Sequence, residues 1–126
     1  VESELEVITP SEPGILGRVL GTLANAGVNL RALCVTSHPE GGRFRLLTSD
    51  NKKAEAALRT LGYKVKAQSV LTVVISDRIG AGAEVGALLG NAVIDIHTAY
   101  ATAAGKDAIL LVLQTNANKK AYETLR

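Results

Sequence analysis

The sequence contains two degenerate copies of one unit, and this repeat constrains the fold more than any other feature. NKKAEAALR at 51–59 recurs as NKKAYETLR at 118–126, an offset of 118 − 51 = 67 residues. Upstream, LEVITPSEPG at 5–14 aligns with LTVVISDRIG at 71–80, an offset of 71 − 5 = 66. The offset changes by one inside the intervening hairpin, where a change in loop length is well tolerated. Both copies should therefore adopt the same fold.

Hydrophobic periodicity gives each copy the same order of elements. In the first copy, the alternation over 4–9 predicts a strand, and apolar residues at spacings of one, three and four predict a helix from Pro13 to about Gly27. HPEGG at 38–42 is a turn between two further strands, and Ser49 or Asp50 caps a second helix. The remaining expected elements are strands at 30–37, 44–48 and 63–66 and a helix through Leu61 in the first copy, then a strand at 70–75, a helix at 82–90, strands at 94–102 and 108–114 and a helix at 118–126 in the second.

The order β-α-β-β-α-β is that of ferredoxin-like folds. We expect an α+β protein of two such units in tandem, with antiparallel sheets and the helices on one face of each sheet. Domain 1 should cover 1–67 and domain 2 should cover 68–126, with the last strand of the second unit missing. Because the only turn signal between the units is Gln68-Ser69, the last strand of unit one should run almost directly into the first strand of unit two.

The stretch SEPGILG at 11–17 joins a strand to a helix. Pro13 suits the first position of a helix, and Gly14 lets another group approach the backbone closely. The N–H groups of the first helical turn have no intrahelical partner and carry partial positive charge, so they suit a small carboxylate. The alternative is an ordinary helix start with no ligand.

Composition argues against nucleic acid and membrane partners. The net charge is +2, and the chain has one Phe, three Tyr and no Trp, too few rings to form a platform for stacking bases. No apolar run is long enough to cross a bilayer. The lone Cys34 reads as a core or half-buried thiol, which suits a reducing, cytoplasmic compartment.

Catalytic and metal-binding patterns are not recognisable. His38 and His97 have no second ligand residue at a useful local spacing, so we expect no metal and no cofactor. No pair of carboxylates stands beside a nucleophile, and GAGAEVG at 80–86 lacks the spacing of a phosphate-binding fingerprint. The repeated lysines after Asn51 and Asn118 read as a solvated face. We expect that the protein is not an enzyme.

Four short motifs carry a resemblance to a known family. SEPGI at 11–15 and GVNL at 27–30 in the first copy have weaker counterparts in DRIGA at 77–81 and VIDI at 93–96. This combination resembles the ACT-domain family of small-molecule regulatory modules. The tandem arrangement is similar to the stand-alone two-ACT proteins of bacteria, which are described as amino-acid-binding.

The resemblance implies a ligand site at an interface between two ACT units. A free amino acid would lie between the loop before the first helix of one unit and the start of the second strand of the other. Backbone N–H groups would hold its carboxylate, and the Asn29 or Asp95 side chain would accept from its ammonium. The residues implied are Ser11, Pro13, Gly14, Ile15, Asn29, Asp77, Gly80, Ala81 and Asp95.

Each of these residues also has a structural interpretation. Ser11 and Asp77 are good helix N-caps, and Asn29 could satisfy only a turn between helix and strand. Asp95 and Ile79 depart from the family's asparagine and proline. The second unit could therefore be mainly a structural partner, with the working loop in the first unit.

Two functions remain open at this point. The first is a tandem ACT sensor that binds a free amino acid, small or branched and aliphatic, forms a homodimer and passes its occupancy to a regulated enzyme. The alternative is a ligand-independent module for oligomerisation or enzyme docking. Gly17 and Gly21 lie four apart in the first helix and would allow close approach either of another backbone or of the unit's own sheet.

Overall fold

The computed structural model describes residues 1–126 and falls into two compact units. The first unit is Ser3–Gln68, and the second is Ser69–Arg126 together with Val1–Glu2. Each unit has strands and helices in the predicted order, so the expectation of two ferredoxin-like βαββαβ units is confirmed. The second unit ends with a helix at Leu125. No helix in the structure is both long enough and apolar enough to span a bilayer.

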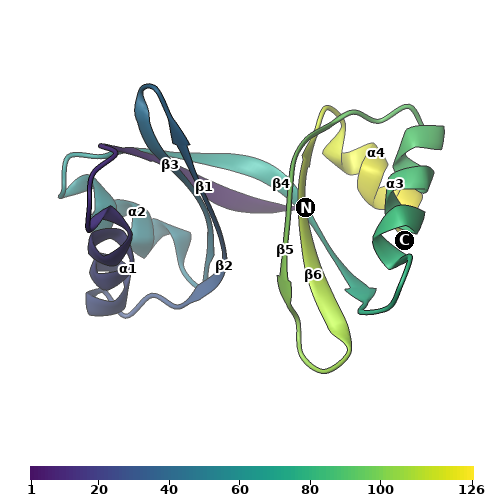
Figure 1. Cartoon of the computed structure of the whole chain (residues 1–126), viewed down its shortest axis with the longest axis horizontal. Coiled ribbons are helices and arrows are strands. Elements are labelled where there is room, and N and C mark those ends of the chain that lie inside the picture. Colours follow the sequence, from purple (N-terminus) through teal and green to yellow (C-terminus); the bar gives the residue numbers. More distant parts are fainter. The chain divides into compact units, whose positions relative to one another are not determined.

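The first unit is an antiparallel sheet with the strand order β2-β3-β1-β4. Both of its helices lie on the same face of these strands (Figure 1). The first and last residues of these two helices lie within about two positions of the predicted ends. The elements are β1 (Glu2–Thr9), α1 (Ile15–Asn25), β2 (Leu30–His38), β3 (Gly41–Thr48), α2 (Asn51–Arg59) and β4 (Lys64–Ser76).

The second unit continues β4 in the order β4-β6-β5, with both helices again on one face (Figure 1). β4 is one strand of 13 residues that contributes to both units, which confirms the direct run from the first unit into the second. The other elements are α3 (Ala81–Asn91), β5 (Ile96–Ala103), β6 (Ala108–Thr115) and α4 (Asn118–Leu125).

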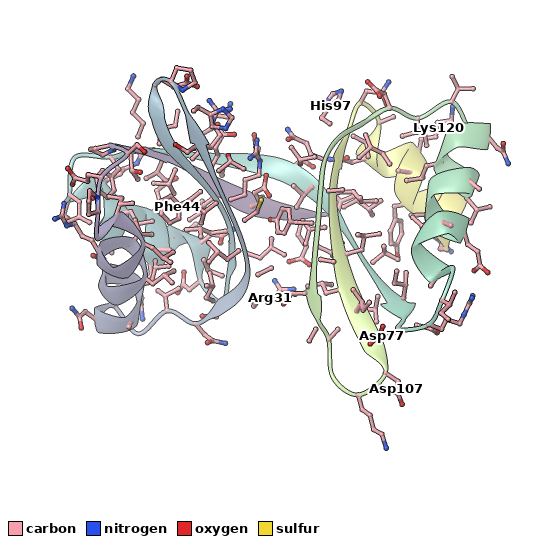
Figure 2. The ribbon with its side chains drawn as sticks, viewed as in Figure 1. Arg31, Phe44, Asp77, His97, Asp107 and Lys120 are labelled. Carbon is pink, nitrogen blue, oxygen red and sulfur yellow. The ribbon has the colours of Figure 1, made fainter.

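Each unit has its own apolar core between helices and sheet. In the first unit, α1 buries Val19 and Leu23, α2 buries Ala54 and Leu58, and Phe44 of β3 is fully buried (Figure 2). The core of the second unit is built from the corresponding elements and contains Leu71, Val85, Leu89, Ile94, Leu113 and Ala121. Burial of these side chains is the main favourable contribution to folding of each unit.

Two local predictions about α1 are wrong. Gly14 has φ +86°, which is incompatible with a helix, so α1 begins at Ile15 and Pro13 is not its first residue. Gly17 and Gly21 do not pack on the sheet of their own unit, because both are exposed and a Cβ at either position would have no atom within 4 Å. The helix turns Val19 and Leu23 towards the sheet instead.

The repeated NKKA segment has a structural reason in its asparagine. Asn51 Oδ1 accepts from Thr48 Oγ1 at 2.6 Å, and its Nδ2 donates to the carbonyl of Ser3 at 3.0 Å. In the second unit, Asn118 Oδ1 accepts from Thr115 N and Oγ1 at 2.9 and 2.7 Å, and its Nδ2 donates to the carbonyl of Ser69 at 3.0 Å. Each asparagine thus links the start of a helix to the end of the strand before it and to a neighbouring strand.

We predict that Asn118→Ala lowers the free energy of unfolding by about 1–3 kcal/mol, because the backbone N–H of the buried Thr115 loses its acceptor. The adjacent Lys119→Ala is the matched control and should change it by less than about 0.5 kcal/mol. Urea denaturation followed by circular dichroism measures both. Equal effects of the two substitutions would contradict the role given to the asparagine.

Candidate functional site

The turn from the first strand into the first helix has the same backbone in both units. Gly14 precedes α1 with φ +86°, and Gly80 precedes α3 with φ +87°. Only glycine adopts this region without strain, so the glycine at this position is required by conformation. A Cβ built on either residue has no atom within 4 Å, so both turns are also open to other groups.

No side chain caps the start of α1 or α3. The interpretation of Ser11 and Asp77 as N-caps is therefore wrong, because each helix begins only after the glycine that lies three residues further on. Ser11 Oγ lies 3.3 Å from Ser37 Oγ of β2, and the backbone N–H of Asp77 donates to the carbonyl of Asp107 at 2.9 Å. The Ile15 N–H donates to the carbonyl of Glu12 at 3.3 Å. This first-turn amide therefore already has an acceptor within the loop.

A cavity of about 460 Å³ lies beside the β1–α1 loop of the first unit. This volume falls in the range of small-molecule sites. Three of the predicted site residues line the cavity together, and the opposite wall comes from the end of β2. The lining residues are Ser11, Glu12, Pro13, Ile15, Val35, Thr36, Ser37, Gly42 and Phe44.

Asn29 does not join this cavity within its own unit. It lies directly before the first residue of β2, whereas the cavity takes Val35 to Ser37 from the other end of that strand. The Asn29 N–H donates to Ser49 Oγ at 2.9 Å, and its carbonyl accepts from the Ser49 N–H at 2.9 Å. The backbone of Asn29 therefore stabilises the junction with the loop before α2.

The predicted residues of the second unit are spread over three places. Asp77 lines a separate cavity of about 330 Å³, Gly80 holds the left-handed turn, and Ala81 is buried at the start of α3. The Asp95 N–H donates to the side-chain Oδ1 of Asn116, and the Asp95 carbonyl accepts from the Asn116 N–H, both at 3.1 Å. Figure 2 shows Asp77 at one end of the second unit and His97, close to Asp95 in the chain, at the other.

Ion pairs at the two loops have reversed polarity. Arg18 of α1 donates to the loop residue Glu12 at 3.0 Å, whereas the loop residue Arg78 donates to Glu84 of α3 at 2.6 Å. The Tyr63 hydroxyl and then Glu12 raise the pKa of Arg18. Arg78 lowers the pKa of the Glu84 carboxyl, so Glu84 keeps its charge at a lower pH than an isolated glutamate would.

The β2 wall was not found from the sequence. It consists of Val35, Thr36 and Ser37, which carry no motif of their own. They reach the loop because β1 and β2 run in the same direction and finish at the same end of the sheet. The pairing of Val35 with Phe44 and of Thr9 with Gly42 places the cavity at this end. No group of three or more His, Cys, Asp or Glu side chains is arranged to hold a metal ion.

The fold and the loop define a tandem ACT-type protein. The profile of the ACT domain pair family matches residues 2–125, and the chain belongs to this family. Among solved structures, protein BT0572 from Bacteroides thetaiotaomicron superposes with a TM-score of 0.90 at 27% identity, covering 99% of this chain and 86% of that one. None of the curated proteins compared with the chain matches it.

A second similar structure is that of an enzyme's regulatory subunit. The ligand-free regulatory subunit of aspartate kinase from Thermus thermophilus superposes with a TM-score of 0.74 at 16% identity, covering 98% of this chain and 89% of that chain. At this level of identity the likeness concerns the fold. This chain therefore shares its fold with the regulatory subunit of an enzyme.

We predict opposite effects for two Gly→Ala substitutions, one in the loop and one in the first turn of α1. Gly14→Ala should destabilise the protein by about 1–2 kcal/mol, because alanine is strained at φ +86°. Gly17→Ala should stabilise it by about 0.5–1 kcal/mol, because the position is helical and its Cβ meets no atom within 4 Å. Thermal and urea unfolding measure both values. Stabilisation by Gly14→Ala would show that the left-handed turn is not kept in solution.

Proposed function

We propose that the protein is a non-enzymatic regulatory module that binds a free amino acid at the β1–α1 loop of its first unit. The observation that carries this proposal is the cavity of about 460 Å³ at the start of a helix that no side chain caps. Membership of the ACT domain pair family supports a small-molecule regulatory role.

The lining of the cavity suits the parts of an amino acid. N–H groups at the start of α1 can hold a carboxylate, helped by the partial positive charge of the helix end. Hydroxyl groups of Ser11 and Ser37, whose oxygens lie 3.3 Å apart, can accept from an ammonium group. Val35 and Ile15 supply apolar surface for a small or branched aliphatic side chain. Glu12 is held by Arg18, so its charge is already compensated.

The exposure of the loop calls for a second surface over the ligand. Ser11, Glu12, Pro13 and Gly14 are exposed, and Val35 on the cavity wall is 42% exposed. Small-molecule sites usually bury most of the ligand surface. We propose that an ACT unit of a second copy covers the site in a homodimer, with the strand start around its Asn29 or Asp95 nearest the ligand.

Regulation would follow from binding that stabilises this assembly. A ligand that contacts both copies favours the state in which they are joined, by its difference in affinity for the two states. The regulatory subunit of aspartate kinase offers a precedent in the same fold. We propose that this occupancy is passed to a partner enzyme in the cytoplasm.

The test compares Gly14→Asp with Gly14→Asn. Asp and Asn both tolerate a left-handed backbone and have almost the same shape, so strain is matched and only the charge differs. A thermal-shift screen of the twenty amino acids on the unaltered protein should find a hit. At about 100 times its Kd, a ligand adds about 2.7 kcal/mol and should raise Tm by several degrees. Gly14→Asp should then weaken binding by at least about tenfold relative to Gly14→Asn, because its carboxylate repels that of the ligand.

Two results would count against the proposal. If no amino acid raises Tm while the chain is dimeric at every ligand concentration, the module serves assembly alone. If a hit binds Gly14→Asp and Gly14→Asn equally well, the ligand is held elsewhere. Calorimetry and light scattering on the same samples separate these results.

A further inference from the structure

The second unit has a cavity at the position that corresponds to the first. Its lining residues are Asp77, Ala101, Thr102, Ala103, Gly105, Ala108 and Ile109. With the offset of 66, Asp77, Ala101, Thr102 and Ala103 correspond to Ser11, Val35, Thr36 and Ser37 of the first cavity. Strand pairing agrees, because Ile109 pairs with Ile75 as Gly42 pairs with Thr9. The duplication has therefore preserved the position of the cavity.

The lining of the second cavity differs in size and polarity. Its volume is about 330 Å³ against about 460 Å³ for the first. Ile109 replaces Gly42 and narrows the site, and Ala103 replaces Ser37 and removes a hydroxyl group. Ala101 and Ala103 now stand where the first cavity has Val35 and Ser37. The remaining polar side chains are Thr102 and Asp77.

Asp77 gives the second cavity a charge that the first does not have in this position. It forms no salt bridge within 4.0 Å, and the neighbouring Arg78 is engaged by Glu84 at 2.6 Å. Lys106, in the hairpin beside the cavity, is not one of the lining residues. In the first cavity the only carboxylate, Glu12, has Arg18 as its partner at 3.0 Å. The second cavity therefore repels carboxylates and attracts cations.

We propose that this cavity is a second binding site that takes a small aliphatic ammonium ion lacking a carboxylate. The ammonium would donate to the Asp77 carboxylate, and the aliphatic chain would lie on Ala101, Ala103 and Ile109, whose side chains share one face of the sheet. The proposal is independent of amino-acid binding at the first cavity. It gives each chain two sites of different chemistry, with the acidic one in the second unit.

The test is a titration of the full chain with the n-hexylammonium ion, with hexanoate as the anion of equal length. Methyl NMR of alanine side chains should show saturable shifts at Ala101 and Ala103 with hexylammonium, and none with hexanoate. Asp77→Asn should weaken hexylammonium binding by at least tenfold. Ser11→Ala, at the equivalent position of the first unit, should leave it unchanged.

Asp77→Asn could lose binding through a folding defect, so a second pair of variants fills one cavity or the other with a leucine side chain. Ala103→Leu should block hexylammonium, while Ser37→Leu at the equivalent position of the first unit should not. Unchanged binding in Asp77→Asn and Ala103→Leu, or no saturable alanine shifts, would overturn the proposal. Loss of amino-acid binding in Ser37→Leu with hexylammonium binding retained would show two separate sites. Amine binding without any amino-acid binding would contradict only the function proposed for the first cavity.

Discussion

The residue between the first strand and the first helix of each unit must adopt a left-handed backbone, and the rest of the candidate site depends on this turn. Gly14 and Gly80 have φ values of +86° and +87°, within one degree of each other despite the divergence of the surrounding sequence. The turn starts the helix without a side-chain cap and leaves open space around the glycine. A cavity lies beside the loop in each unit as a result of the same local geometry.

Duplication has kept the framework of the units while their functional surface has diverged. The asparagine at the first position of α2 and of α4 makes the same links to neighbouring strands in both units. The positions that line the cavities have changed from hydroxyl to carboxylate and from glycine to isoleucine. The ion pair at the loop has exchanged its charges between Glu12–Arg18 and Arg78–Glu84. The reversal of an exposed ion pair on a loop costs little stability. The change from Gly42 to Ile109 lies instead in a strand, at the side of the cavity.

The architecture could be predicted from the sequence because it rests on periodicity and on the repeat. Alternation in β1 and the apolar stripe of α1 both follow from which side chains face the core. Prediction was less successful where several side chains could satisfy the same group. Ser11 and Asp77 are common cap residues, yet the left-handed glycine after them moves the start of the helix beyond their reach. The β2 wall of the cavity depends on the pairing of strands distant in the chain, which no local motif encodes. The cover that we propose for the loop would come from an assembly, and a single chain carries no signal for it.

The continuity of β4 determines how the two units can be separated. Its 13 residues pass without a linker from one unit into the other, and the boundary between Gln68 and Ser69 falls inside the strand. Glu2 also belongs to the second unit, where its Oε2 accepts from Thr72 Oγ1 at 2.7 Å. Cleaving the chain at the boundary would break a strand and leave fragments with exposed sheet edges, which tend to aggregate. A single copy of either unit would therefore need a new end for β4, which favours retention of the two units in one chain.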